Sequence, residues 1–168
     1  PHLNPKGLQG GYAFFDGQMD DHGLGLWVAE QARQAGARIH QHSAVQRIAP
    51  TGVLTLQDGR ELPFERIANI AGPWALELLA QSGLQAEHRL DLVRGSHLVL
   101  AAPCPQAYLC EVPGERRIFF VLPWQGQTLL GTTEVRQGLD ETIACSQAEE
   151  AYLLAAYQHY RTQQAPQP

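Results

Sequence analysis

Arg94-Gly95-Ser96-His97 begins a long apolar run, and from this point the chain reads as a series of short strands. The dipeptides Pro113-Gly114 and Gln125-Gly126 mark two of the turns between them. Strands joined by such short turns run antiparallel, so this half of the chain is predicted to form an antiparallel sheet. The predicted strands cover residues 93–101, 108–112, 116–123 and 128–135.

The residues before this sheet predict a strand, a helix and a second strand. Residues 12–16 read as the first strand, and Asp20 or Asp21 is placed to cap the helix that follows. Gly36 ends this helix, and residues 37–43 read as the second strand. The apolar residues of the helix recur at spacings of three and four: Leu24, Trp27, Val28, Ala32 and Ala35.

Between these two parts the sequence predicts a small meander. Asp58-Gly59 favours a type I′ hairpin turn, because both central residues of that turn need a positive φ. The predicted strands of this segment cover residues 44–48, 53–57, 60–62 and 66–71.

Helices are predicted at two further places. The last strand of the meander runs into Gly72-Pro73, and proline suits the first position of a helix over residues 74–81, which Gly83 ends. Near the C-terminus, Ser146-Gln147-Ala148-Glu149 matches a capping box and predicts a helix through about Arg161. We expect the tail after residue 162 to be frayed.

Composition limits the classes of protein to consider. The chain has 168 residues, 44% of them hydrophobic, which is enough for a core. A net charge of -5 gives no basic footprint, so nucleic acid is not expected as a partner. There is no apolar run of about 18–20 residues, and nothing at the start of this sequence resembles a signal peptide. The first residue is Pro1 rather than Met, which fits a piece of a longer protein.

The cysteines point to a reducing compartment. Cys104, Cys110 and Cys145 form no CxxC motif and no paired framework. We therefore expect reduced thiols that act as small core residues in a cytoplasmic protein.

Four motifs, in order, resemble one family. They are Asn69-Ile70-Ala71-Gly72-Pro73-Trp74, Gly95-Ser96-His97, the segment from Phe120 to Trp124, and Gly131-Thr132-Thr133. The order and spacing resemble the FAD-dependent glycerol-3-phosphate dehydrogenases, within the D-amino-acid-oxidase-like flavoenzymes. No Gly-x-Gly-x-x-Gly follows a strand, and that turn is what cradles a dinucleotide pyrophosphate. The chain therefore resembles the central part of such an enzyme.

This resemblance implies an α+β fold in which two domains are interleaved. Part of an FAD-binding α/β domain with a β-meander would take residues 21–89. An antiparallel-sheet substrate domain would take residues 1–20 and 90–145, and a C-terminal helix and tail would take residues 146–168. A strand–helix–strand order followed by a meander is also common in other α+β proteins.

The resemblance also implies which residues form the site. His97 would contact the substrate, and Arg94 would face the flavin or an anionic substrate. The residues implied for FAD binding are Val45, Ala71, Gly72, Pro73, Trp74, Gly131 and Thr132. From the residues alone, a histidine on an apolar strand, such as His97, is more often a core residue than a substrate contact. A valine such as Val45 is likewise more often a core residue than a cofactor contact.

Two other groups have structural interpretations. His40 and His42 would share one face of a strand, but no third ligand follows at a suitable spacing, so we expect no metal site. Asp20 and Asp21 stand at the start of a helix, where capping and the helix dipole explain them better than acid–base chemistry does.

The resulting hypothesis is a fragment of an enzyme that oxidises glycerol 3-phosphate to dihydroxyacetone phosphate, with hydride transfer to FAD and electrons passed to quinone. The parent would be cytoplasmic, or peripheral on the inner face of the membrane. We expect the fragment alone to be inactive, to bind FAD weakly, and to form a homodimer through exposed strand edges. The alternatives are a related amine or 2-hydroxyacid oxidase and a non-catalytic binding or assembly module.

Overall fold

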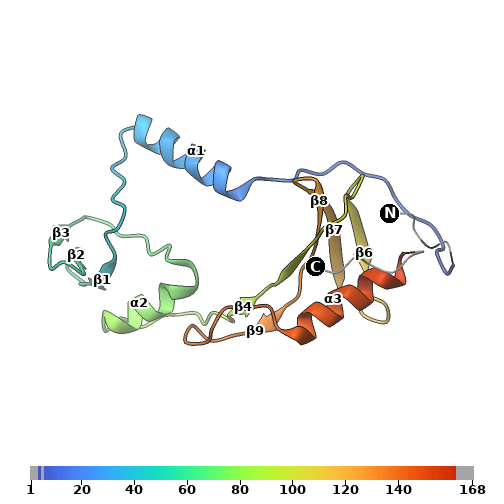
Figure 1. The fold of residues 1–168 in the computed structure, drawn as a ribbon. Helices are drawn as coiled ribbons and strands as arrows, with labels where there is room; N and C mark the ends of the chain where they lie inside the picture. The colour runs from blue at the N-terminus through green and yellow to red at the C-terminus, as the bar shows by residue number, and fades with distance from the viewer. Residues whose placement is uncertain (1–3, 5, 162–168) are drawn as a thin grey trace. The chain divides into compact units, whose positions relative to one another are not determined.

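The structure, a computed structural model, describes residue 4 and residues 6–161, and its chain divides into two compact units (Figure 1). One unit is Tyr12–Leu90, and the other contains the chain from Asp91 onward together with the residues before Tyr12. The predicted α+β class with antiparallel sheets is confirmed. The predicted assignment of FAD-binding and substrate domains stays a prediction, because compactness does not establish what a unit binds. The frayed tail was predicted for residues outside those described.

The unit from Asp91 onward is built on a four-stranded antiparallel sheet. Its strand order is β5-β8-β7-β6, with neighbouring strands paired in register from His97↔Gly131 to Trp124↔Gln127. A two-stranded sheet of β4 and β9 lies next to it along the chain, and helix α3 spans Gln147–His159. The strands are β4 (Val93–Arg94), β5 (His97–Leu100), β6 (Tyr108–Glu111), β7 (Ile118–Trp124), β8 (Gln127–Gly131) and β9 (Val135–Arg136).

Helix α3 covers one face of the four-stranded sheet (Figure 1). Alternate residues of β5, β7 and β8 point to this face, as the two-residue period of a strand requires. Phe119, Leu100, Leu130 and Leu153 are completely buried between helix and sheet. The opposite face of the sheet is exposed and largely apolar, with Val99, Ile118, Phe120 and Leu109 among its residues.

Two of the predicted strands are interrupted. The predicted strand over residues 93–101 is β4 followed by β5, and the one over residues 128–135 is β8 followed by β9. Arg94 pairs with Val135, and His97 pairs with Gly131. Two residues lie between Arg94 and His97, whereas three lie between Gly131 and Val135. The register therefore shifts by one residue between the two ladders, as at a β-bulge. Single-strand propensity carries no signal of this mismatch, so the sequence predicted continuous strands.

The two hairpin turns are of different types. Gln125 and Gly126 both have positive φ, at 47° and 79°, and Trp124 pairs with Gln127, so this is a type I′ turn. The predicted type I′ turn at Asp58-Gly59 is wrong in detail, because only Gly59 has positive φ. The amide of Gly59 donates to Leu56 and the amide of Leu56 donates to Arg60, which gives a three-residue loop with a glycine bulge.

The unit Tyr12–Leu90 contains two helices and a three-stranded meander. Helix α1 (Asp21–Gln34) begins where predicted, with the Asp20 side chain accepting from the Gly23 amide, and it ends before Gly36. No residue of α1 is buried. The other elements are β1 (Val45–Ile48), β2 (Val53–Leu56), β3 (Glu61–Pro63), the 3-10 turn η1 (Gly72–Trp74) and α2 (Ala75–Gln81).

Three predicted strands of this unit are wrong. Residues 12–16, 37–43 and 66–71 are not strands, although β1, β2, β3 and α2 lie close to their predicted positions. A strand is defined by hydrogen bonds to a neighbour, and these segments pair with none of the described residues. A hairpin supplies its own partner along the chain, which is why the meander forms and these isolated segments do not.

The cysteines correct one expectation. Cys104 is buried and Cys110 is half-buried, and burial raises the pKa of the Cys110 thiol to about 11. Cys145 is exposed, so it is not a core residue. Within the described part of the chain, no helix has the length and apolarity needed to cross a membrane.

Candidate functional site

His97 and Gly131 face each other at the ends of β5 and β8. They are directly paired across the ladder, and the next residue in the same row is Phe120 of β7. A Cβ built on Gly131 would lie 2.3 Å from Cδ2 of His97. The imidazole of His97 therefore rests on the bare backbone of Gly131, and only glycine leaves room for it.

The surroundings of His97 favour its neutral form. Its side chain is on the sheet face that α3 does not cover, where the alternation of β5 places it beside Val99. Partial burial lowers the pKa of His97 below its usual value. A neutral imidazole carries one donor and one acceptor nitrogen, so it can either donate to a substrate oxygen or accept a proton from one.

Two hydrogen bonds join the segment before His97 to the segment after Gly131. The amide of Ser96 donates to Oγ1 of Thr133 at 2.9 Å, and the amide of Thr133 donates to the carbonyl of Ser96 at 3.2 Å. Gly95 also has no room for a side chain, because a Cβ there would lie 2.3 Å from Oγ1 of Thr132. The Gly-Ser-His and Gly-Thr-Thr motifs, which are more than thirty residues apart in the sequence, thus form one site.

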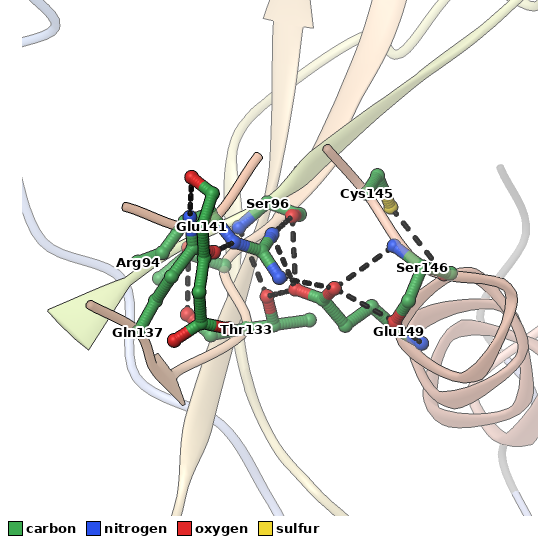
Figure 2. A network of polar contacts seen from close by, with 9 residues as sticks. Arg94, Ser96, Thr133, Gln137, Glu141, Cys145, Ser146 and Glu149 are labelled. Atoms are coloured by element: carbon green, nitrogen blue, oxygen red, sulfur yellow. Dashed lines mark hydrogen bonds and ion pairs between the residues drawn. The ribbon is translucent and has the colours of Figure 1, made fainter. Parts of the chain in front are cut away.

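Behind this site lies a buried carboxylate that accepts six hydrogen bonds (Figure 2). Oε1 of Glu149 accepts from Nη1 of Arg94 at 3.0 Å, from Oγ of Ser96 at 2.9 Å and from Oγ1 of Thr133 at 2.7 Å. Oε2 accepts from Nη2 of Arg94 at 2.7 Å and from the amide and hydroxyl of Ser146 at 2.9 and 2.8 Å.

The position of Glu149 follows from the face of α3 on which it lies. The buried residues of α3 are Glu149, Leu153, Ala156 and Tyr157, which form one stripe at helical spacing. The carboxylate continues this stripe at the N-terminal end of the helix, where it also completes the predicted capping box with Ser146. The Arg94 guanidinium, together with the Ser146 and Thr133 donors, holds the pKa of Glu149 far below its usual range.

Arg94 is occupied by this network. Its side chain and that of Glu149 are only 14% and 6% exposed, and the pairing is bidentate. The remaining donors of Arg94 contact the hydroxyl of Ser96 and the amide oxygen of Gln137. The predicted role of Arg94 toward a flavin or an anionic substrate stays a prediction, and every contact the structure records for it is structural.

Five of the residues predicted to bind FAD belong to the other unit. Val45 is the first residue of β1 and is half-buried. Ala71 precedes the turn η1, which contains the other three, Gly72, Pro73 and Trp74.

The side chain of Asn69 fixes this turn. It accepts from the Ala71 amide at 3.2 Å and donates to the Ala75 carbonyl at 2.9 Å. Gly72 has a φ of 56° and nothing lies within 4 Å of a Cβ built there, so its backbone is open to close approach by a cofactor. The bare face of Gly131, by contrast, is taken by His97. Thr132 is half-buried, and its hydroxyl donates to the carbonyl of Thr133.

Sequence reasoning missed the roles of Ser96, Thr133 and Glu149. The first two stand inside motifs that were singled out, but no partner was assigned to them. Glu149 was recognised only as a capping residue. The signal that would have found it is the stripe of Leu153, Ala156 and Tyr157, because a glutamate on the buried face of a helix requires a cation.

The pair His40 and His42 does not form a strand face. Both residues lie outside the strands, and His42 has a left-handed φ of 54°. Among the residues that the structure describes, no group of three or more histidine, cysteine or acidic side chains is placed to hold a metal ion.

Comparison with known proteins gives a consistent result. The family described as DAO, FAD dependent oxidoreductase, matches residues 1–167. A protein of Synechocystis sp. named glycerol-3-phosphate dehydrogenase is 32% identical over 89% of this chain. The crystal structure of the glycerol-3-phosphate dehydrogenase from Bacillus halodurans complexed with FAD matches 85% of the chain, with a TM-score of 0.76 and 25% identity.

A second solved structure is also similar to this chain, with a lower TM-score. Glycine oxidase from Geobacillus kaustophilus matches 82% of the chain with a TM-score of 0.60 and 25% identity. The chain spans about a third of the length of all three proteins, at 32%, 32% and 36%.

Proposed function

Because the chain belongs to the FAD-dependent oxidoreductase family, we propose that it is part of an enzyme that oxidises glycerol 3-phosphate to dihydroxyacetone phosphate. The observation that carries this proposal is the meeting of Gly95-Ser96-His97 with Gly131-Thr132-Thr133 at one point of the sheet. These are the motifs on which the resemblance to glycerol-3-phosphate dehydrogenases rests, and two of the similar proteins carry that name.

The chemistry of this reaction assigns a role to His97. Oxidation of the secondary alcohol removes a hydride from C2 and a proton from the hydroxyl. FAD, when bound, supplies the acceptor for the hydride. The neutral imidazole of His97 is suited to hydrogen-bond the substrate hydroxyl and to take its proton, because its pKa is lowered by partial burial.

The residues proposed for the cofactor are those that the resemblance implies. Gly72 is the best placed, because nothing occupies the space beside its Cα, and Val45, Ala71, Pro73 and Trp74 complete the proposed set in this unit. Gly131 and Thr132 are proposed on the other unit. We further propose quinone as the final electron acceptor, a peripheral position of the whole enzyme on the cytoplasmic face of a membrane, and a homodimer.

An absorbance experiment tests the function. The whole gene product is purified with FAD, and glycerol 3-phosphate is added without oxygen. We expect a yellow protein whose visible flavin absorbance bleaches with this substrate, whereas the 168-residue chain alone stays colourless. His97→Asn should slow the bleaching by on the order of 100-fold, the usual contribution of a general base.

Glycine is the competing substrate to include, because the fold is also similar to a glycine oxidase. Bleaching by glycine or another amine, with none by glycerol 3-phosphate, would replace the proposed reaction by amine oxidation. A gene product that binds no flavin would leave the non-catalytic binding module as the better hypothesis.

A further inference from the structure

We propose that Glu149 is a positioning residue for His97. Its carboxylate lies on the α3 side of the sheet and holds together the adjoining ends of β5 and β8. The imidazole of His97 lies on the opposite side of the sheet at the same ends. This inference rests on the proposed function only in taking His97 as the residue that contacts substrate. Glu149 itself lies behind the sheet and touches neither His97 nor its open face.

The first step is that Glu149 binds both strand ends at one atom. Its Oε1 accepts from Ser96, which precedes β5, and from Thr133, which follows β8. The same oxygen accepts from Arg94, at the end of β4. One atom of α3 therefore connects segments on both sides of the interruption in the sheet.

The second step is that the regular ladder is missing at this place. Between the pairs Arg94↔Val135 and His97↔Gly131 the register shifts by one residue, so the backbone cannot continue its alternating hydrogen bonds. The hydroxyl of Thr133 substitutes for a backbone acceptor by accepting from the Ser96 amide, and it donates its own proton to Glu149. The carboxylate is thus the final acceptor of this chain of hydrogen bonds.

The third step is that His97 is sensitive to the relative position of these strands. Its imidazole occupies the space that a Cβ of Gly131 would fill. Ser96 and His97 are consecutive, so Ser96 points to Glu149 while His97 points to the open face. Loosening the Ser96–Thr133 connection lets β5 move against β8 and releases the imidazole.

The two oxygens of Glu149 have separable tasks, which allows a matched test. Oε2 accepts from both donors of Ser146 and caps α3, whereas Oε1 binds Ser96 and Thr133. Thr133→Val keeps the shape of the side chain but removes a hydroxyl that both donates to Oε1 and accepts from the Ser96 amide. Ser146→Ala removes the hydroxyl contact to Oε2 and leaves Oε1 with its partners. Glu150→Gln, the next residue of α3, removes the same charge from the same turn.

The measurement is the titration of His97 by nuclear magnetic resonance in the 168-residue chain, with amide hydrogen exchange of Ser96 as a second readout. We expect Thr133→Val to raise the pKa of His97 toward its ordinary value and to speed exchange of the Ser96 amide by about tenfold, the effect of losing one hydrogen bond. Thr133→Ser should restore both. Ser146→Ala and Glu150→Gln should leave His97 unchanged.

An unchanged His97 titration in Thr133→Val, or an equal change in Ser146→Ala, would overturn the positioning role and leave Glu149 as a cap and ion-pair partner only. If Thr133→Val does not fold, Ser96→Ala provides the comparison, because it removes the other hydroxyl donor to Oε1. None of these readouts uses FAD or substrate. Failure of the whole gene product to oxidise glycerol 3-phosphate would therefore refute the proposed function without affecting this result.

Discussion

Glu149 shows how a buried ion pair is accommodated at the level of single residues. Both oxygens of its carboxylate accept from several donors, and among the described residues Arg94 is the cation that pairs with it. Burying a charge is unfavourable unless hydrogen bonds replace its lost hydration, and here six such bonds do so. Removing either partner leaves the other charge buried and unpaired, so we expect this change to lower stability more than breaking one of the exposed ion pairs does.

The pKa of Glu149 predicts a specific loss of stability in acid. Its folded pKa lies below the ordinary value of 4.5, so its contribution is complete above about pH 5 and declines as the pH falls through the acid range. As the pH falls below 4.5, the unfolded chain takes up a proton that the folded chain, with its lower pKa, does not yet take up. Unfolding of the wild type should therefore be coupled to about one more proton than unfolding of Glu149→Gln.

Thermal unfolding at a series of pH values measures this difference. Glu149→Gln should have a lower Tm at pH 7 and a flatter decline of Tm toward acid, while Glu150→Gln should follow the wild type. Parallel curves for the wild type and Glu149→Gln would contradict the assignment.

Gly131→Ala tests the contact under His97. The added Cβ would lie 2.3 Å from the imidazole, so the ring must leave its place or the strands must separate. We expect a loss of ~1–3 kcal/mol of unfolding free energy, as for overpacking elsewhere, together with a changed His97 resonance. Gly25→Ala is the matched control, because nothing lies within 4 Å of its Cβ position. It should increase stability by ~0.5–1 kcal/mol, the helix preference of alanine over glycine.

At the scale of elements, the predictable parts are those whose hydrogen bonds are local. Helix α3 was predicted from its capping box, α1 from Asp20 and Gly36, and β6, β7 and β8 from their turn dipeptides. The partner of a distant segment is not encoded in such signals. For this reason the shift of register at Ser96 and Thr133, and the pairing of Arg94 with a glutamate 55 residues away, were not predicted.

The type I′ turn between β7 and β8 predicts a stabilising substitution. Gln125 has a φ of 47°, a conformation that costs an ordinary side chain ~1–2 kcal/mol. Asparagine tolerates it, and Asn-Gly is the preferred type I′ pair. Gln125→Asn should therefore raise the unfolding free energy by up to ~1 kcal/mol in a denaturant titration. Gln127→Asn, one strand position later, should give no gain, and an equal gain there would exclude the turn as the cause.

At the scale of the whole molecule, the notable feature is how much apolar surface is left without cover. Helix α1 has no buried residue, and its Leu24, Trp27 and Val28 are between 43% and 60% exposed. The face of the large sheet opposite α3 is apolar as well. Exposed patches of this kind usually mark a surface that contacts other protein. Within the described part of the chain, β5 and β6 are edge strands that pair with a neighbouring strand on one side only.

We therefore expect the chain to self-associate. Sedimentation velocity over a concentration series should show a shift from monomer to dimer, and replacing an edge residue such as Val99 with lysine should weaken it. A chain that remains monomeric at the highest concentration would contradict the dimer. Dimerisation that Val99→Lys leaves unchanged would place the contact away from the edge of β5.

The one-residue difference between the two ladders also determines toward which face of the sheet the side chains of Thr132 and Thr133 point. The segment from Gly131 to Val135 is one residue longer than its counterpart from Arg94 to His97. If Glu134 were deleted, the ladders would merge into one regular pair of strands, and strict alternation would bring Thr132 to the side of α3 and Thr133 to the side of His97. The extra residue thus reverses the alternation of side chains between the two faces of the sheet. The length of this segment, and not only its composition, determines which threonine hydroxyl donates to Glu149.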